Sequence, residues 1–135
     1  MGQARVRQWL KIAWASPYTL LGLTLGVGGL LFGGKAKARG GVIEFYEGGV
    51  KWMIHRLPQG QWTLAFTLGH TILGQTEASI DVARAHERVH VAQYERWGPF
   101  MLPVYYACSV FVWMRGGHFY RDNPFEREAS DDQRE

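Results

Sequence analysis

Two histidines and a glutamate in the middle of the chain have the residue types and the spacing of a metal-dependent hydrolytic site. They belong to the segment His86-Glu87-Arg88-Val89-His90. On a helix, residues four apart lie on the same face, so His86 and His90 can bind one metal ion from one side. Glu87 lies about 100° around that helix, which suits it to act on a metal-bound water. Two imidazoles, a carboxylate base and an open coordination position are the requirements of zinc-dependent hydrolysis, so the motif predicts Zn²⁺ as the cofactor.

The same motif also fits a purely structural interpretation. A pattern this short arises by chance, and His86 and His90 would then be ordinary histidines on a solvated helix. The motif alone does not distinguish the two interpretations, so support for a metal site has to come from the rest of the chain.

The size and composition of the chain indicate one small domain. The chain has 135 residues, a net charge of +3 and a single cysteine, Cys108, so no internal disulfide can form. The basic residues flank an apolar segment and do not form a nucleic-acid-binding motif, so no nucleic-acid partner is expected. We expect a membrane anchor with basic flanks in residues 1–39, a folded domain in residues 40–129 and an acidic tail in residues 130–135.

An uncharged segment near the N-terminus, residues 12–34, predicts a transmembrane helix. At 1.5 Å per residue, a helix of this length matches the roughly 30 Å apolar core of a bilayer. The expected location is therefore the membrane, with a single pass, and membrane lipid is an expected partner. Basic residues lie on both sides of the segment, so its orientation, and with it the side of the domain, stays open. A buried or re-entrant hairpin and a cleaved secretory signal are the alternatives.

Three short segments between this helix and the motif predict an antiparallel sheet. Residues 42–46 and 50–57 have the composition of strands and are separated by a turn. A third strand is expected in residues 62–73, where side chains alternate between an apolar and a more polar face. Tight turns between consecutive strands favour an antiparallel meander.

Three helices are expected after the sheet. The motif helix covers about residues 80–97 and ends at Gly98-Pro99. A second uncharged and aromatic segment, residues 97–114, predicts an apolar helix that packs against the first apolar segment or dips into the membrane. A full membrane span and a core helix are the alternatives. A short helix begins at Asn123-Pro124, with asparagine as its cap. The sequence thus predicts an α+β fold with a transmembrane helix, a three-stranded antiparallel sheet and these three helices.

Residues 62–129 resemble the gluzincin group of zinc metallopeptidases, in particular its very small membrane-associated members. The resemblance rests on two motifs that occur in the family's order on two helices. The first is the His-Glu-x-x-His motif that begins at His86, and the second is Glu126-Arg127-Glu128-Ala129. In that family the second helix carries a Glu-x-x-Ala motif whose glutamate completes the zinc site.

The resemblance implies Glu126 as the third zinc ligand, three residues before Ala129, and leaves Glu128 as the alternative. The family usually has an aspartate four residues after this ligand. Here that position is Ser130, and Asp131 follows it, so the chain departs from the family pattern there.

The resemblance also implies a minimal zincin-like fold and a mechanism. In that fold a strand before the motif helix binds an extended peptide substrate, and four residues on one face of the third predicted strand have that place: Trp62, Leu64, Phe66 and Leu68. The activity would be hydrolysis of peptide bonds by a zinc-bound water, with Glu87 as the general base. Three residues are candidates to stabilise the developing oxyanion or to support the ligands: His70, His118 and Tyr120.

A non-catalytic function competes with the hydrolase. A chain of this length has little left with which to build a substrate cleft. The protein would then be a membrane-anchored accessory or assembly subunit of a larger membrane complex that retains a zincin-like scaffold. Residues 97–114 would bind a membrane-protein partner, and a metal would join two helices. Two histidines and a carboxylate also suit iron, which leaves a metal-binding or redox role as a third candidate.

Overall fold

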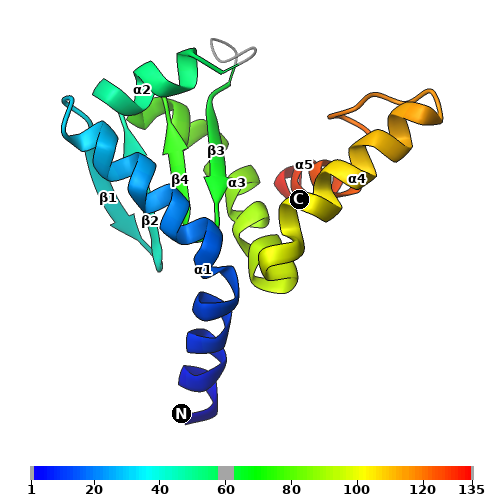
Figure 1. Ribbon diagram of the computed structural model, residues 1–135, viewed down its shortest axis with the longest axis horizontal. Coiled ribbons are helices and arrows are strands. Elements are labelled where there is room, and N and C mark those ends of the chain that lie inside the picture. The colour runs from blue at the N-terminus through cyan, green and yellow to red at the C-terminus, as the bar shows by residue number, and fades with distance from the viewer. Residues whose placement is uncertain (1, 58–62, 135) are drawn as a thin grey trace.

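The computed structural model describes residues 2–57 and 63–134, with side chains as far as residue 130. Four strands form one sheet, and helices lie on both of its faces (Figure 1). In chain order the elements are α1 (Gly2–Leu30), β1 (Lys35–Arg39), β2 (Val42–Tyr46), α2 (Gly48–His55), β3 (Ala65–Leu68), β4 (Thr71–Gly74), α3 (Glu77–Trp97), η2 (Gly98–Phe100), α4 (Met101–Met114) and α5 (Pro124–Arg134). The fold is therefore α+β.

The sheet is mixed, with the strand order β1-β2-β4-β3. Strands β1 and β2 pair antiparallel across a turn at Gly40 and Gly41, whose φ angles of 54° and 80° suit glycine. Strands β3 and β4 are also antiparallel, whereas β2 and β4 run parallel at the centre. A parallel pair requires a crossover connection, which here contains α2 and β3. The prediction of a three-stranded antiparallel sheet is therefore wrong.

The second predicted strand, residues 50–57, lies largely in helix α2. Val50 and Ile54 are 0% and 1% exposed, whereas Trp52 between them is 60% exposed. In a strand these three side chains would share one face, while burial at positions i and i+4 alone is the helical pattern. The apolar residues of this segment fit both the two-residue period of a strand and the 3.6-residue period of a helix. Packing against the sheet selected the helix.

The third predicted strand, residues 62–73, folds back on itself as the β3–β4 hairpin. Gly69 forms part of the turn with a φ angle of 59°, a left-handed conformation that glycine adopts without strain. The alternation of apolar and polar residues does not reveal the turn, because both strands of the hairpin carry apolar residues. Trp62, at the start of the predicted strand, lies outside the described residues.

Helices on both faces of the sheet bury its central strand β4. Ile72 packs in a cluster with Ile80 and Val91 of α3. The next residue, Leu73, points to the opposite face and packs in a cluster with Ile54 of α2 and Leu23 of α1. The sheet is thus a layer between α3 on one face and α1 with α2 on the other (Figure 1).

The second half of helix α1 lies along the sheet, and its glycines allow it to lie close (Figure 1). Gly22, Gly26 and Gly29 are buried against side chains of the sheet and of α2. Among the described residues, no helix is both long enough and apolar enough to cross a membrane. The predictions of a transmembrane helix in residues 12–34 and of a single-pass membrane location are therefore wrong. Glycines that are common in membrane helices serve here in helix–sheet packing.

Two glycines of α1 provide a matched test of this packing. A Cβ atom at Gly26 would overlap the ring of Phe45, whereas a Cβ at Gly28 would meet no atom within 4 Å. Gly28→Ala should therefore stabilise the fold by up to about 1 kcal/mol, the difference in helix propensity. Gly26→Ala should destabilise it by about 1–3 kcal/mol, as overpacking does. Urea unfolding of both variants measures the difference, and equal stabilities would show that α1 does not pack on the sheet in this way.

Candidate metal centre

Helix α3 brings the two histidines of the motif to one face. Its N-terminus is capped by Thr76, whose hydroxyl accepts a hydrogen bond of 3.0 Å from the backbone N–H of Ser79. The rings of His86 and His90 then lie 4.9 Å apart between centroids, one turn apart along the helix. His90 is buried and His86 is half-buried, so both imidazoles lie in a site with restricted access to water.

Helix α5 brings a glutamate to the same place from 36 residues further along the chain than His90. Asn123 fixes the start of this helix. Its Oδ1 accepts a 2.8 Å hydrogen bond from the backbone N–H of Phe125, and its Nδ2 donates to the Tyr105 carbonyl and to Ser109 Oγ of α4. Because Phe125 also packs in a core cluster with residues of α1 and α3, the first turn of α5 is held against α3 and presents Glu126 to the histidines.

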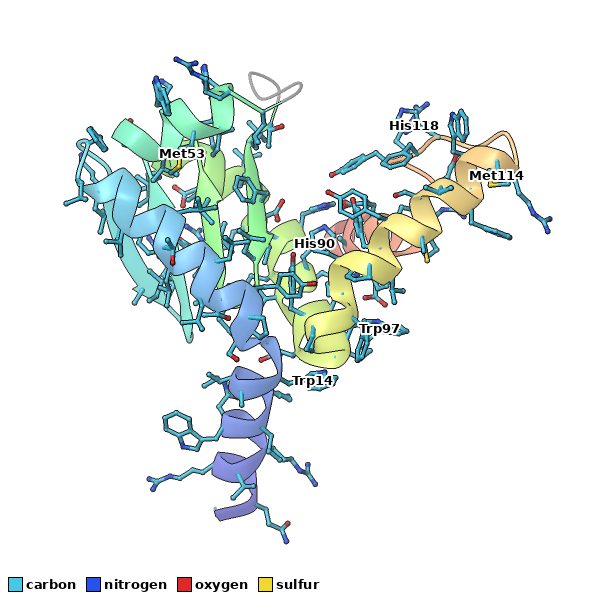
Figure 2. The ribbon with its side chains drawn as sticks, in the orientation of Figure 1. Trp14, Met53, His90, Trp97, Met114 and His118 are labelled. Atoms are coloured by element: carbon cyan, nitrogen blue, oxygen red, sulfur yellow. The ribbon has the colours of Figure 1, made fainter. Side chains whose placement is uncertain are left out.

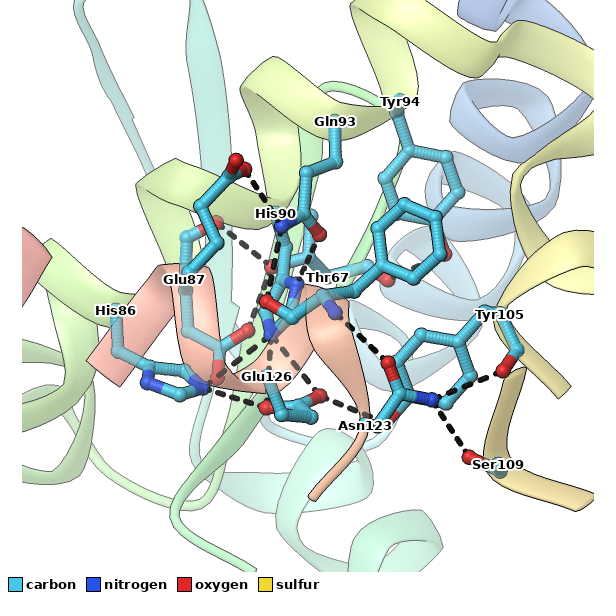
Figure 3. A network of polar contacts seen from close by, with 12 residues as sticks. Thr67, His86, Glu87, His90, Gln93, Tyr94, Tyr105, Ser109, Asn123 and Glu126 are labelled. Carbon is cyan, nitrogen blue, oxygen red and sulfur yellow. Dashed lines mark hydrogen bonds and ion pairs between the residues drawn. The ribbon is translucent and has the colours of Figure 1, made fainter. Parts of the chain in front are cut away.

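His86, His90 and Glu126 together form a group that could hold a metal ion (Figure 3). The Nε2 atoms of the two histidines are 3.2 Å apart. Glu126 Oε2 lies 2.9 Å from Nε2 of His86 and 3.2 Å from Nε2 of His90. Tetrahedral zinc with bonds of 2.0–2.1 Å places its ligand atoms about 3.3 Å apart, so the three donors already have nearly the separations that zinc requires.

The electrostatics of this group also suit a cation. Burial by itself would raise the pKa of Glu126, but hydrogen bonds from His86 and His90 outweigh it and hold that pKa well below its usual range. Burial by itself would lower the pKa of His90, but its hydrogen bond with Glu126 and the charge of that carboxylate raise it. Glu126 is thus an ionised carboxylate that accepts hydrogen bonds from the two imidazoles, and a metal ion can take the place of the protons between them.

Tyr105 of α4 holds the carboxylate of Glu126 through its second oxygen. Its hydroxyl donates a 2.7 Å hydrogen bond to Glu126 Oε1. Burial and the negative charge of Glu126 raise the pKa of Tyr105, so this hydroxyl stays a donor. Such outer hydrogen bonds orient carboxylate ligands of metals.

Glu87 lies beside the three residues and is not one of the group. It is buried, and the Thr67 hydroxyl donates a 2.6 Å hydrogen bond to its Oε2 (Figure 3). Burial raises the pKa of Glu87 above that of an exposed glutamate, although His90 and Thr67 act in the opposite direction. A carboxylate with a raised pKa next to a metal site is suited to accept a proton and to return it.

The structure separates Glu128 from the ligand group. Its Oε1 accepts a 2.9 Å hydrogen bond from Gln93 Nε2, and its Oε2 lies 3.7 Å from the Arg96 guanidinium. Of the two glutamates that the sequence left open, Glu126 is the one grouped with the histidines.

The three residues expected to stabilise an oxyanion have different surroundings. His70 pairs with Glu95 at 2.9 Å, towards the end of α3. His118 is exposed, accepts backbone hydrogen bonds from Tyr120 and Arg121 at Nδ1, and lies near the far end of α4 from His90 (Figure 2). Tyr120 is half-exposed, and partial burial of its hydroxyl and then the charge of Glu126 raise its pKa.

Two of the side chains expected to bind substrate, Phe66 and Leu68, point away from the metal group. Phe66 and Leu68 pack in the cluster between the sheet and α1 with α2, and Leu64 is partly exposed before the start of β3. Thr67, between Phe66 and Leu68, faces α3 and reaches Glu87. If β3 contacts a substrate, it does so through its backbone edge.

Sequence reasoning missed the residues that support the ligands. Gln93 lies three residues after His90, so helix spacing alone could have placed it on the same face. Asn123 was recognised only as a helix cap. Thr67 and Tyr105 had no signal in the sequence, because they meet the site only through the packing of β3 and α4 on the other elements.

No protein-family model, curated protein or solved structure matches this chain. The resemblance to a metallopeptidase family therefore stays an expectation. A proposed function has to rest on the geometry of the site.

Proposed function

We propose that the protein is a zinc-dependent hydrolase that cleaves peptide bonds. One observation carries the proposal: the ligand atoms of His86, His90 and Glu126 converge within 4.8 Å of one another, beside the buried carboxylate of Glu87. Two histidines and a glutamate form one of the ligand sets of catalytic zinc, in which the fourth position is left for water or substrate.

The residues around the metal group have complementary roles in this proposal. When bound, zinc supplies a Lewis acid and lowers the pKa of a coordinated water to about 7. Glu87 accepts a proton from the attacking water and delivers it to the leaving amine. Thr67 orients the carboxylate of Glu87 through its short hydrogen bond. Tyr105 holds Glu126, and the Tyr120 hydroxyl is available to donate to a developing oxyanion.

The backbone of β3 supports an extended peptide as the substrate. This strand lies at the edge of the sheet, and among residues 2–57 and 63–134 it pairs only with β4. Because Thr67 of β3 contacts Glu87, a peptide that paired with the outer edge of β3 would pass close to the base. Recognition through the backbone makes few demands on substrate side chains, so broad sequence tolerance is expected.

Metal analysis together with a peptide-cleavage assay tests the proposal. The purified protein should contain one zinc per chain and cleave members of a fluorescence-quenched peptide library. A chelator should abolish cleavage, and stoichiometric zinc should restore it. A protein that binds no zinc, or cleavage that survives complete removal of the metal, would refute the proposed function.

An exposed apolar surface on α4 favours a second candidate, a non-catalytic interaction subunit. Five large side chains on the outer part of this helix are exposed: Tyr106, Val110, Phe111, Trp113 and Met114. Exposed apolar patches of this kind mark interaction sites. In this function a metal would join α3 to α5 and stabilise the fold. Zinc that raises the unfolding temperature in a protein without peptidase activity would favour this candidate.

A further inference from the structure

Gln93 is a buried polar side chain next to the metal group, and both ends of its amide are hydrogen-bonded. It lies on α3, its side chain is fully buried, and it makes three hydrogen bonds (Figure 3). Its Nε2 is 2.9 Å from the Phe125 carbonyl oxygen and 2.9 Å from Glu128 Oε1. Its Oε1 is 2.8 Å from Nδ1 of His90.

The two partners of Nε2 determine which way the amide of Gln93 points. A carbonyl oxygen and a carboxylate oxygen are both acceptors, so they require the NH₂ group of the amide. The reversed orientation would bring Oε1 against both oxygens and leave the buried Phe125 carbonyl without its donor, at a cost of roughly 1–3 kcal/mol. Oε1 therefore faces His90.

The orientation of the amide in turn determines the tautomer of His90. Because Oε1 only accepts, Nδ1 of His90 has to carry a hydrogen. In the neutral ring the lone pair is then on Nε2, the atom that lies 3.2 Å from both His86 Nε2 and Glu126 Oε2. Only the charged ring carries a second proton on Nε2 and donates from it to Glu126. This is the state in which an imidazole can bind a metal through Nε2.

We propose that Gln93 is a positioning residue that holds His90 in its metal-binding tautomer and connects it to the helix that carries Glu126. The connection follows from the bond to the Phe125 carbonyl, which directly precedes Glu126 in the first turn of α5. The Gln93 amide thus determines the tautomer of His90 and holds the helix that carries Glu126. The inference rests on the proposed metal site, but the tautomer of His90 is a property of the metal-free chain.

Three variants separate the positioning role from a merely structural one. Gln93→Leu removes every hydrogen bond of the side chain. Gln93→Glu keeps an acceptor for His90 Nδ1 but loses the donor to Phe125 and places a second carboxylate near Glu128. Gln75→Leu is a matched control, because the Gln75 amide also bonds a histidine and a carbonyl, at 2.9 Å to His55 and 2.7 Å to the Thr63 carbonyl, away from the metal group.

Two measurements on the full chain decide the proposal. Long-range ¹H–¹⁵N spectra of the metal-free protein, at a pH where His90 is neutral, report its tautomer. Competition with a chromophoric chelator reports the zinc affinity. We expect Nδ1–H in the wild type and in Gln93→Glu, and a loss of this preference in Gln93→Leu. Zinc affinity should fall about 10–100-fold in Gln93→Leu, the usual cost of losing an outer hydrogen bond to a ligand.

Comparing the zinc affinities of the variants with their stabilities separates a positioning role of Gln93 from a structural one. Gln93→Glu should bind zinc more tightly than Gln93→Leu even if urea unfolding shows that it is no more stable, and Gln75→Leu should bind zinc as the wild type does. Zinc affinities that simply follow the stabilities of the variants, or an Nε2–H tautomer in the wild type, would overturn the proposal. If the wild type bound no zinc, the proposed function would fail, and the tautomer of His90 in Gln93→Leu would still decide the role of Gln93.

Discussion

Glu87→Gln should abolish most peptide hydrolysis and leave zinc bound. Glu87 is beside the metal group and not part of it, so an amide at this position removes the base and leaves His86, His90 and Glu126 in place. General acid–base catalysis contributes about 10²- to 10⁴-fold, and we expect kcat to fall by that factor. Glutamine has nearly the same shape, and its amide oxygen can still accept the hydrogen bond from Thr67, so the fold should be retained.

Glu95→Gln is the matched control for this experiment. Glu95 is also on α3 and also bonds a histidine, His70, at 2.9 Å, but it is two turns further along the helix than Glu87. Its replacement should leave kcat within about 3-fold of the wild type, since it removes no catalytic group. Full activity of Glu87→Gln would show that another group is the base. Loss of zinc in that variant would show that Glu87 supports the ligands.

Glu126→Gln should lose zinc, whereas Glu128→Gln should keep it. Glu126 contributes one of three ligand atoms, and an amide is a much weaker zinc ligand than a carboxylate. Its replacement should weaken zinc binding by more than the roughly 100-fold that loss of an outer hydrogen bond costs. The oxygen of a glutamine at position 128 can still accept the bond from Gln93, so Glu128→Gln should bind zinc nearly as the wild type does.

Thermal unfolding with and without zinc gives an independent readout for these two variants. A ligand at 100 times its dissociation constant stabilises the native state by about 2.7 kcal/mol. This stabilisation should be present in the wild type and in Glu128→Gln and absent in Glu126→Gln at the same zinc concentration. The reverse result, with zinc stabilising only Glu126→Gln, would assign Glu128 as the ligand and contradict the grouping seen in the structure.

Features that depend on neighbouring residues alone could be read from the sequence. The helix around His86 and His90 and the shared face of these two residues follow from a four-residue spacing and the geometry of one turn. Strand β2 and the start of α5 at Asn123-Pro124 follow from local composition and capping. Glu126 was also a candidate, but only a family resemblance separated it from Glu128.

Features that depend on packing between distant segments required the tertiary structure. The uncharged segment in residues 12–34 suits a lipid environment as well as a protein surface, and only the sheet beneath α1 shows which one its glycines contact. Residues 50–57 satisfied both the helical and the strand period until Val50 and Ile54 were seen to be buried together. The third predicted strand became a hairpin because Gly69 allows a turn that alternation does not reveal.

The candidate metal centre depends on both local spacing and long-range packing. Sequence spacing determined that two imidazoles lie on one face of a helix, because the backbone of a helix sets that distance. Whether a carboxylate 36 residues beyond His90 reaches them, and whether Gln93, Thr67 and Tyr105 hold the ligands and the base, depends on how α5, β3 and α4 pack around α3. Such distances are set by the sum of many weak contacts, so only the tertiary structure could decide them.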